Sequence, residues 1–255
     1  MIGIPGADKT PAPSLDSIMG EAPPVGSGVA PGVQVRDLAI QEAALAYGAR
    51  AGLANASQKI DFILNEQRDS LDKTWNIGPL EIVGPSGTKI LPPVITERTG
   101  VYDQPDANTV LIADDQYEIV AAARFSPVTP LWQTYLIMSW STPTKPDYSV
   151  YPKTDDERAI WKAGIAKGWA AGQAQAIAIF KVNVSRLQRD YAGMLKWEQL
   201  VSEGKASAPV VAETLQGVTG GGDKLTVGQG IVRLTAPAQL LPNPANWHAP
   251  GQVIQ

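Results

Sequence analysis

The sequence predicts an α+β protein with two long packed helices, a small antiparallel sheet of hairpins and proline-rich extended termini. Two runs are long enough to form the helices: Gln34–Trp75, which contains no proline, and Tyr151–Ser207, which contains none after Pro152. Short apolar runs separated by glycine, proline and aspartate indicate strands and turns elsewhere. We expect a flexible Pro/Gly-rich N-terminal arm at residues 1–33, an α+β domain at residues 34–236 and a proline-rich C-terminal tail at residues 237–255.

The N-terminal arm offers few large apolar side chains for packing, so we expect it to act as a tether. The first long helix follows from Gln34. After it, Gly78-Pro79 and later proline pairs break any helix over Ile77–Arg98 and leave short strands.

A hairpin is predicted where Thr109–Ile112 and Tyr117–Val120 flank Asp114-Asp115, which would form the turn. Pro130 favours the first turn of a short helix over Leu131–Met138.

The second long helix has both of its ends marked. Thr154 and Glu157 form a capping box, in which the hydroxyl accepts from the Glu157 amide and the carboxylate accepts from the Thr154 amide. Gly204 is suited to the left-handed conformation that closes a helix, and no proline occurs between Thr154 and Pro209. The run therefore predicts one helix that is longer than a compact domain of this size needs.

Small residues recur at every fourth position in both helical runs. They are Gly48, Gly52 and Ala56 in the first run and Gly164, Gly168, Gly172 and Ala176 in the second. Each interior glycine lowers helix stability by about 1 kcal/mol relative to alanine, so the series needs a structural reason. A groove that admits another helix backbone supplies one. We expect the two helices to pack there; a docking site for another subunit is the alternative.

Neither helical run predicts a membrane span, because Arg50, Lys162 and Lys167 interrupt them before the roughly 20 apolar residues that a span requires. Beyond the second helix, Lys224–Val227 and Ile231–Thr235 enclose Gly228-Gln229-Gly230 and predict a second hairpin. An isolated hairpin is marginal in water, so we expect the two hairpins to share one sheet.

Composition excludes several functional classes. The chain has 21 basic and 25 acidic residues, a net charge of −4, and no basic stripe, which argues against direct nucleic-acid binding. It contains no cysteine, which removes disulfides, zinc–thiolate sites and cysteine nucleophiles. The N-terminus lacks the pattern of a signal peptide, so we expect any export signal to have been removed from this sequence.

No residue pattern predicts catalytic, cofactor-binding or metal-binding chemistry. The sole histidine, His248, lies in the tail, and Asp155-Asp156 are explained by the start of a helix. The run Thr219–Asp223 is rich in glycine but is not followed by the Gly-Lys-Ser/Thr of a phosphate-binding loop, so a turn before a strand is expected. We therefore predict that the protein is not an enzyme and uses no cofactor.

Several ordered motifs carry a family resemblance. They are AALAYGARAGL (43–53), LPPV (91–94), IADDQYEIVAAARF (112–125), TPLWQTYL (129–136), YPKTDDERAIW (151–161), RLQRDYAGML (186–195) and GVTGGGDKLTV (217–227). With these motifs the chain resembles the DotC proteins of type IVB secretion systems, called TraI in the conjugation systems of IncI-type plasmids. The resemblance covers the chain from about Gln34 to Trp247.

The resemblance implies a structural subunit of the outer-membrane core complex, at the periplasmic face of the Gram-negative cell envelope. Its expected partners are a DotD-like lipoprotein, a DotH-like secretin-related subunit that it helps to place, and other copies of itself in a ring-like assembly. Such a complex transfers DNA or effector proteins. Family members are lipoproteins, but this sequence lacks the acylated cysteine, so a lipid anchor would have to lie upstream. The alternative is a free periplasmic module that binds a ligand or a protein.

Overall fold

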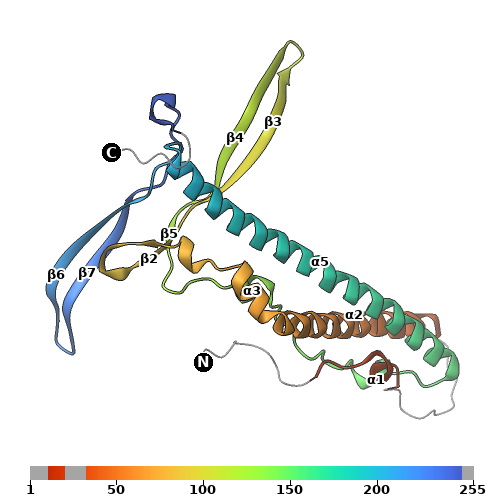
Figure 1. The fold of residues 1–255 in the computed structure, drawn as a ribbon. Helices are drawn as coiled ribbons and strands as arrows, with labels where there is room; N and C mark the ends of the chain where they lie inside the picture. Colours follow the sequence, from red (N-terminus) through yellow and green to blue (C-terminus); the bar gives the residue numbers. More distant parts are fainter. Residues whose placement is uncertain (1–10, 21–32, 249–255) are drawn as a thin grey trace. The chain divides into compact units, whose positions relative to one another are not determined.

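The computed structural model describes residues 11–20 and 33–248, and the chain divides into two compact units (Figure 1). Unit 1 comprises Met1–Leu71 and Tyr135–Val184, and unit 2 comprises Asp72–Thr134 and Ser185–Gln255. One continuous helix, α5 (Asp155–Ser202), contributes residues to both. The predicted α+β class with two long packed helices is confirmed.

Unit 1 is built on α2 (Val33–Glu66) and the first part of α5. Its core consists mainly of aromatic and branched side chains from these helices, among them Tyr47, Trp161 and Ile165. The Tyr47 and Tyr151 rings both lie against Trp161, with ring centroids 6.5 Å and 5.1 Å away. Burial of such large rings contributes much of the hydrophobic stabilisation that a helix pair can gain.

The range expected to be a flexible arm contains a short helix, α1 (Leu15–Met19), within its described residues. The Ser14 side chain accepts a hydrogen bond from the Ser17 amide, which caps the first turn. Ile18 is fully buried in the core of unit 1. Leu15 and Met19 also pack against this core, so apolar contacts attach the segment although the surrounding composition is that of a tether.

The first predicted helix is interrupted near its end. α2 ends at Glu66, Gln67 forms a turn, and α3 (Arg68–Thr74) follows. The predicted helix at Leu131–Met138 is α4, which covers Trp132–Leu136. Trp132 is buried and donates its indole N–H to Asp72 Oδ1 at 2.6 Å, so the polar end of a large core side chain is satisfied.

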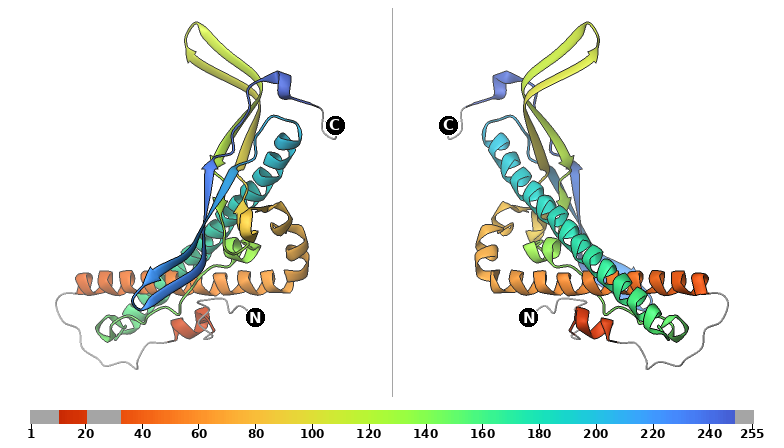
Figure 2. Two further views of the ribbon diagram at one scale, coloured as in Figure 1. Left: turned by 90° about the vertical axis from the view of Figure 1, so that its left-hand side faces the viewer. Right: turned by 90° about the vertical axis from the view of Figure 1, so that its right-hand side faces the viewer.

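Unit 2 contains three separate antiparallel sheets, shown in Figures 1 and 2. Strands β1 (Ile82–Val83), β2 (Lys89–Leu91) and β5 (Arg124–Phe125) form one sheet in the order β1-β2-β5. The other two are narrow two-stranded hairpins. The first hairpin pairs β3 (Val94–Asp106) with β4 (Thr109–Ala121), and the second pairs β6 (Val210–Gly221) with β7 (Lys224–Ala236).

The predicted hairpin turns were both wrong, and so was the single shared sheet. Asp114-Asp115 lie within β4, and the turn of the first hairpin is at residues 107–108, where the Asn108 amide donates to Asp106 Oδ1 at 2.8 Å. Gly228 lies within β7 at a bulge, and the turn of the second hairpin is at residues 222–223. The structure therefore has two longer hairpins, each in its own sheet.

The C-terminal end of α5 is closed by Gly204, whose φ is +70°. The Lys205 and Ala206 amides donate back to the Leu200 carbonyl at 2.8 Å and 3.1 Å, which satisfies the last turn. The described part of the tail returns to this helix end. Ala206 pairs with Leu240 in an isolated bridge, and the His248 amide donates to the Glu203 carbonyl at 3.0 Å.

Candidate functional site

The small residues of α2 and α5 lie where the backbones of the two helices approach closely. A Cβ atom added to Gly168 would lie 2.9 Å from the Ala49 amide nitrogen, and one added to Gly172 would lie 2.7 Å from that of Leu53. A Cβ on Gly48 would lie 2.5 Å from the Ile165 carbonyl oxygen. Side-chain carbons do not approach backbone atoms so closely, so the crossing admits glycine alone at these positions.

The remaining members of the series differ in their surroundings. A Cβ on Gly52 would lie 2.9 Å from the Trp169 Cα atom, and one on Gly164 would lie 2.8 Å from the Ala44 Cβ atom. Ala56 and Ala176 are buried. The crossing therefore runs over several turns of both helices and uses the two glycine series together.

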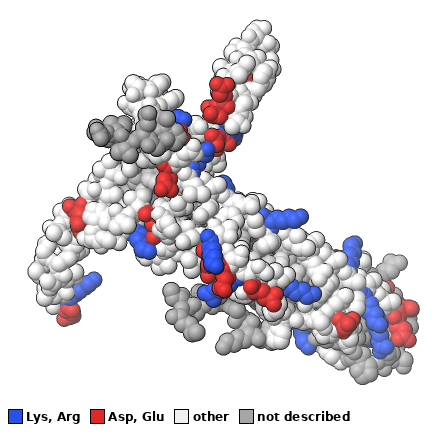
Figure 3. Space-filling model, in the orientation of Figure 1, with Lys and Arg blue, Asp and Glu red and all other residues white. Residues whose placement is uncertain are grey.

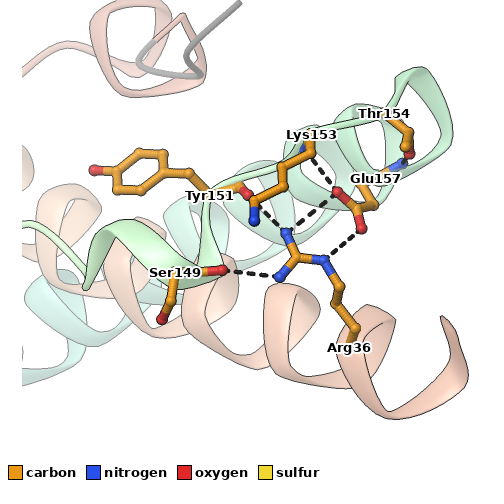
Figure 4. Close-up of polar contacts among 6 residues, drawn as sticks. All are labelled: Arg36, Ser149, Tyr151, Lys153, Thr154 and Glu157. Atoms are coloured by element: carbon orange, nitrogen blue, oxygen red, sulfur yellow. Dashed lines mark hydrogen bonds and ion pairs between the residues drawn. The ribbon is translucent and has the colours of Figure 1, made fainter. Parts of the chain in front are cut away.

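The start of α5 is held by a second set of contacts, drawn in Figure 4. The Thr154 hydroxyl accepts from the Glu157 amide at 3.2 Å, and Glu157 Oε2 accepts from the Lys153 amide at 2.6 Å. Arg36 of α2 donates through Nε to Glu157 Oε1 at 2.7 Å. Its Nη1 and Nη2 donate to the carbonyls of Ser149 and Tyr151 at 2.9 Å and 3.1 Å. One guanidinium thus joins α2, the preceding loop and the helix cap.

Burial acts to raise the pKa of the Glu157 carboxyl, but the Arg36 guanidinium and the Lys153 amide outweigh it, so the net pKa is lowered. The carboxylate therefore stabilises the fold above its ordinary unfolded pKa, and this stabilisation is lost as the pH falls through the lower folded value. This ion pair is a structural clamp between helices in unit 1.

The base of the β3–β4 hairpin is anchored on the last turns of α5. Ile95 packs with Trp197 and Leu200 in a buried cluster. A Cβ on Gly193 would lie 2.8 Å from the Ile95 carbonyl oxygen, which is a further close approach of backbones. Lys196 pairs with Glu97 at 2.8 Å beside this base.

Beyond its base, the β3–β4 hairpin is exposed and acidic. It carries six acidic residues and one basic residue, which are Glu97, Asp103, Asp106, Asp114, Asp115 and Glu118 with Arg98. Figure 3 shows acidic side chains along it. Large apolar side chains are also exposed there, including Tyr102 and Ile112, which form a cross-strand pair. Exposed apolar side chains on a thin two-stranded ribbon indicate a contact surface for other molecules.

The outer part of the β6–β7 hairpin has one apolar face and one polar face despite its bulges. Gln216 is the extra residue in β6 and Gly228 the extra residue in β7, so the pairs Leu215–Gly230 and Val218–Val227 remain on the same face. Four side chains on the outer part of that face are 63 to 74 % exposed; they are Leu215, Val218, Leu225 and Val227. On the other face the Thr219 hydroxyl hydrogen-bonds to Gln229.

Charge is nearly absent from the outer part of the β6–β7 hairpin. Its charged residues are Glu213 and Arg233 toward the base and Asp223 and Lys224 at the turn. Figure 3 shows the intervening surface without charged side chains in that view. The two hairpins therefore present different chemistry, one acidic and the other apolar and uncharged.

Comparison with known protein families matches residues 34–249 to a TraI family described as "Type IV secretory system, conjugal DNA-protein transfer". The chain belongs to this family. The matched range contains both long helices and both hairpins of this TraI-family protein. No curated protein matches it.

The TraI family description names a secretory system and names no catalytic reaction. Among the described residues, no group of three or more His, Cys, Asp or Glu side chains gathers where a metal ion could bind. His248 Nδ1 lies 3.2 Å from the Asn246 carbonyl oxygen. Within residues 11–20 and 33–248, no helix has the length and apolar character of a membrane span.

Arg36 and the outer parts of the hairpins were not predicted from the sequence. Arg36 joins Glu157 across 121 positions of sequence, so no local pattern marks it. The alternation of apolar and polar residues in β7 was a usable signal, but the glycines at its bulge resembled a turn.

We predict that Gly168→Leu destabilises the TraI-family protein by about 1 to 3 kcal/mol, because the added side chain must push apart two helix backbones. Ala171→Leu, on the exposed side of the same helix, is the matched control and should change stability little. Thermal unfolding of both variants measures the difference. Equal melting temperatures for Gly168→Leu and the wild type would contradict the close crossing.

We predict that Arg36→Met destabilises the protein by about 2 kcal/mol at neutral pH, because Glu157 loses its charged partner. The difference from the wild type should shrink as the pH falls below the ordinary glutamate pKa, where the carboxylate becomes protonated. Denaturant unfolding at a series of pH values measures it. Arg158→Met is the control, because its partner Asp155 is 91 % exposed and such surface pairs contribute little. A difference in unfolding free energy between Arg36→Met and the wild type that does not change with pH would contradict the role of the ion pair.

Proposed function

We propose that this protein is a structural subunit of the outer-membrane core complex of a type IVB secretion or conjugation system. It acts at the periplasmic face of the outer membrane, where it helps to place and stabilise a DotH-like secretin-related subunit. A DotD-like lipoprotein and further copies of this chain, arranged in a ring, complete its surroundings. The complex serves the transfer of DNA or effector proteins.

Membership of a secretion-system family supports the coarser part of this proposal. The observation that carries the structural role is the pair of long hairpins, which expose apolar side chains, and the base of the β3–β4 hairpin is anchored on α5. A subunit that works by contact needs surfaces of this kind. The anchored base would hold the β3–β4 hairpin at a fixed position on the fold for a neighbouring subunit.

A direct contact with the transferred DNA is not part of the proposal. The chain is acidic overall, and the β3–β4 hairpin carries a marked excess of carboxylates. Like charges would repel a phosphate backbone. The proposed role in transfer therefore operates through the protein subunits of the channel.

We predict that deleting the gene in its host removes the DotH-like partner from the outer-membrane fraction and abolishes transfer, because the partner loses the subunit that places it. Cell fractionation and a transfer assay measure the two effects. Restoring the wild-type gene from a plasmid is the control and should recover both. Normal partner placement and normal transfer in the deletion strain would refute the proposal.

A further inference from the structure

The two edges of the β3–β4 hairpin differ in their ability to accept another strand. In β3, Gly100 has a φ of +60° and Pro105 has no amide hydrogen, so both disturb the row of backbone donors. Proline and bulges are devices that natural proteins use to prevent edge pairing. The sequence Thr109–Ala121 of β4 contains neither proline nor glycine, and all its residues have negative φ. The register of β4 shifts once, at Val120 near the base, so β4 is the open edge beyond that residue.

That open edge has no strand against it in the described part of the chain, where β4 pairs with β3 alone. The edge is also long, at 13 residues. It exposes apolar side chains beside its backbone, with Leu111 56 % and Ile112 76 % exposed. A long exposed edge with apolar side chains is a template for pairing with another chain.

The charge of β4 indicates which chain can pair with it. Asp114, Asp115 and Glu118 are exposed, and the strand has no lysine or arginine. An added strand places its side chains opposite those of β4, where unlike charges attract and like charges repel. A strand with lysine or arginine at these positions and apolar side chains opposite Leu111 and Ile112 is complementary on both counts.

The β4 strand of a second copy does not meet these requirements at this edge. Antiparallel pairing of two β4 strands about their acidic centre would bring Asp114 and Asp115 of one copy against those of the other. Nucleic acid is disfavoured by the same carboxylates. Charge therefore selects a basic segment of a different protein.

We propose that the free edge of β4 binds an extended basic segment of another protein subunit, with apolar residues opposite Leu111 and Ile112 and lysine or arginine opposite Asp114, Asp115 and Glu118. Main-chain hydrogen bonds add this segment as a third strand, and Asp114, Asp115 and Glu118 select its charge. The inference rests on the proposed function as a contact subunit, and it assigns one of the contacts to a particular edge and chemistry.

The first experiment couples carboxylates directly to lysines in the assembled complex. A water-soluble carbodiimide joins carboxyl and amino groups that are in contact and adds no spacer, and mass spectrometry then identifies the joined peptides. We expect Asp114, Asp115 or Glu118 to be joined to lysines in an extended segment of another protein. Coupling of these residues solely to other copies of this chain, or no coupling in an intact complex, would overturn the inference.

The second experiment reverses charge on one edge at a time. Asp114→Lys with Asp115→Lys changes the charge of the β4 edge by +4. Asp103→Lys with Gln104→Lys changes the charge of β3 by +3, also at exposed positions and not opposite Asp114 or Asp115, and serves as the control. We expect the β4 variant to lower recovery of the partner and transfer by about tenfold or more, and the β3 variant to lower them much less.

The neutral variant Asp114→Asn with Asp115→Asn is a control for misfolding, because it removes both charges and keeps the shape of both side chains. We expect a smaller loss from it than from the lysine variant, with an unchanged melting temperature. Wild-type transfer by the lysine variant, in a host where gene deletion abolishes transfer, would overturn the inference and leave the proposed function standing. Normal transfer after deletion would instead refute the proposed function.

Discussion

The close backbone contact between α2 and α5 is the constraint on which unit 1 depends. Gly168 and Gly172 allow the carbonyl and amide groups of α2 to approach positions that any side chain would occupy. Glycine lowers the stability of each helix on its own. The arrangement is stable because the free energy gained by packing the two helices exceeds the free energy lost through the low helix propensity of glycine. The aromatic side chains beside the crossing, including Trp161, bury large areas and provide that packing.

The Arg36 clamp complements the crossing in a different way. Apolar packing is tolerant of small shifts along a helix, whereas four directed bonds to Glu157, Ser149 and Tyr151 fix the start of α5 relative to α2. Glu157 acts in the helix cap and in the ion pair together. The same helix continues into unit 2, where Gly193 and Trp197 support the base of the first hairpin.

Local signals predicted the helices well because the chemistry of helix ends is local. Thr154 and Gly204 act within one turn of the residues that they cap, so their roles can be inferred from spacing alone. Hairpin turns were less predictable. Asp114-Asp115 and Gly228-Gln229-Gly230 have turn-forming composition, yet cross-strand pairing holds both within strands. Strand β6 was missed, because it is defined by its pairing with β7 and not by a local sequence pattern.

The β6–β7 hairpin shows how cross-strand pairing overrides turn-forming composition. A single bulge moves every later side chain of its strand to the opposite face of the hairpin, so the apolar side chains would be divided between the two faces. With one bulge in each strand between Leu215 and Val218, Val218 and Val227 stay in line with Leu215, while Thr219 and Gln229 remain together on the opposite face. The apolar face therefore continues through the outer part of the hairpin past both of these bulges. An isolated ribbon gains little stability from an apolar face in water, so the preserved alternation is consistent with a surface that is covered in the assembled secretion system.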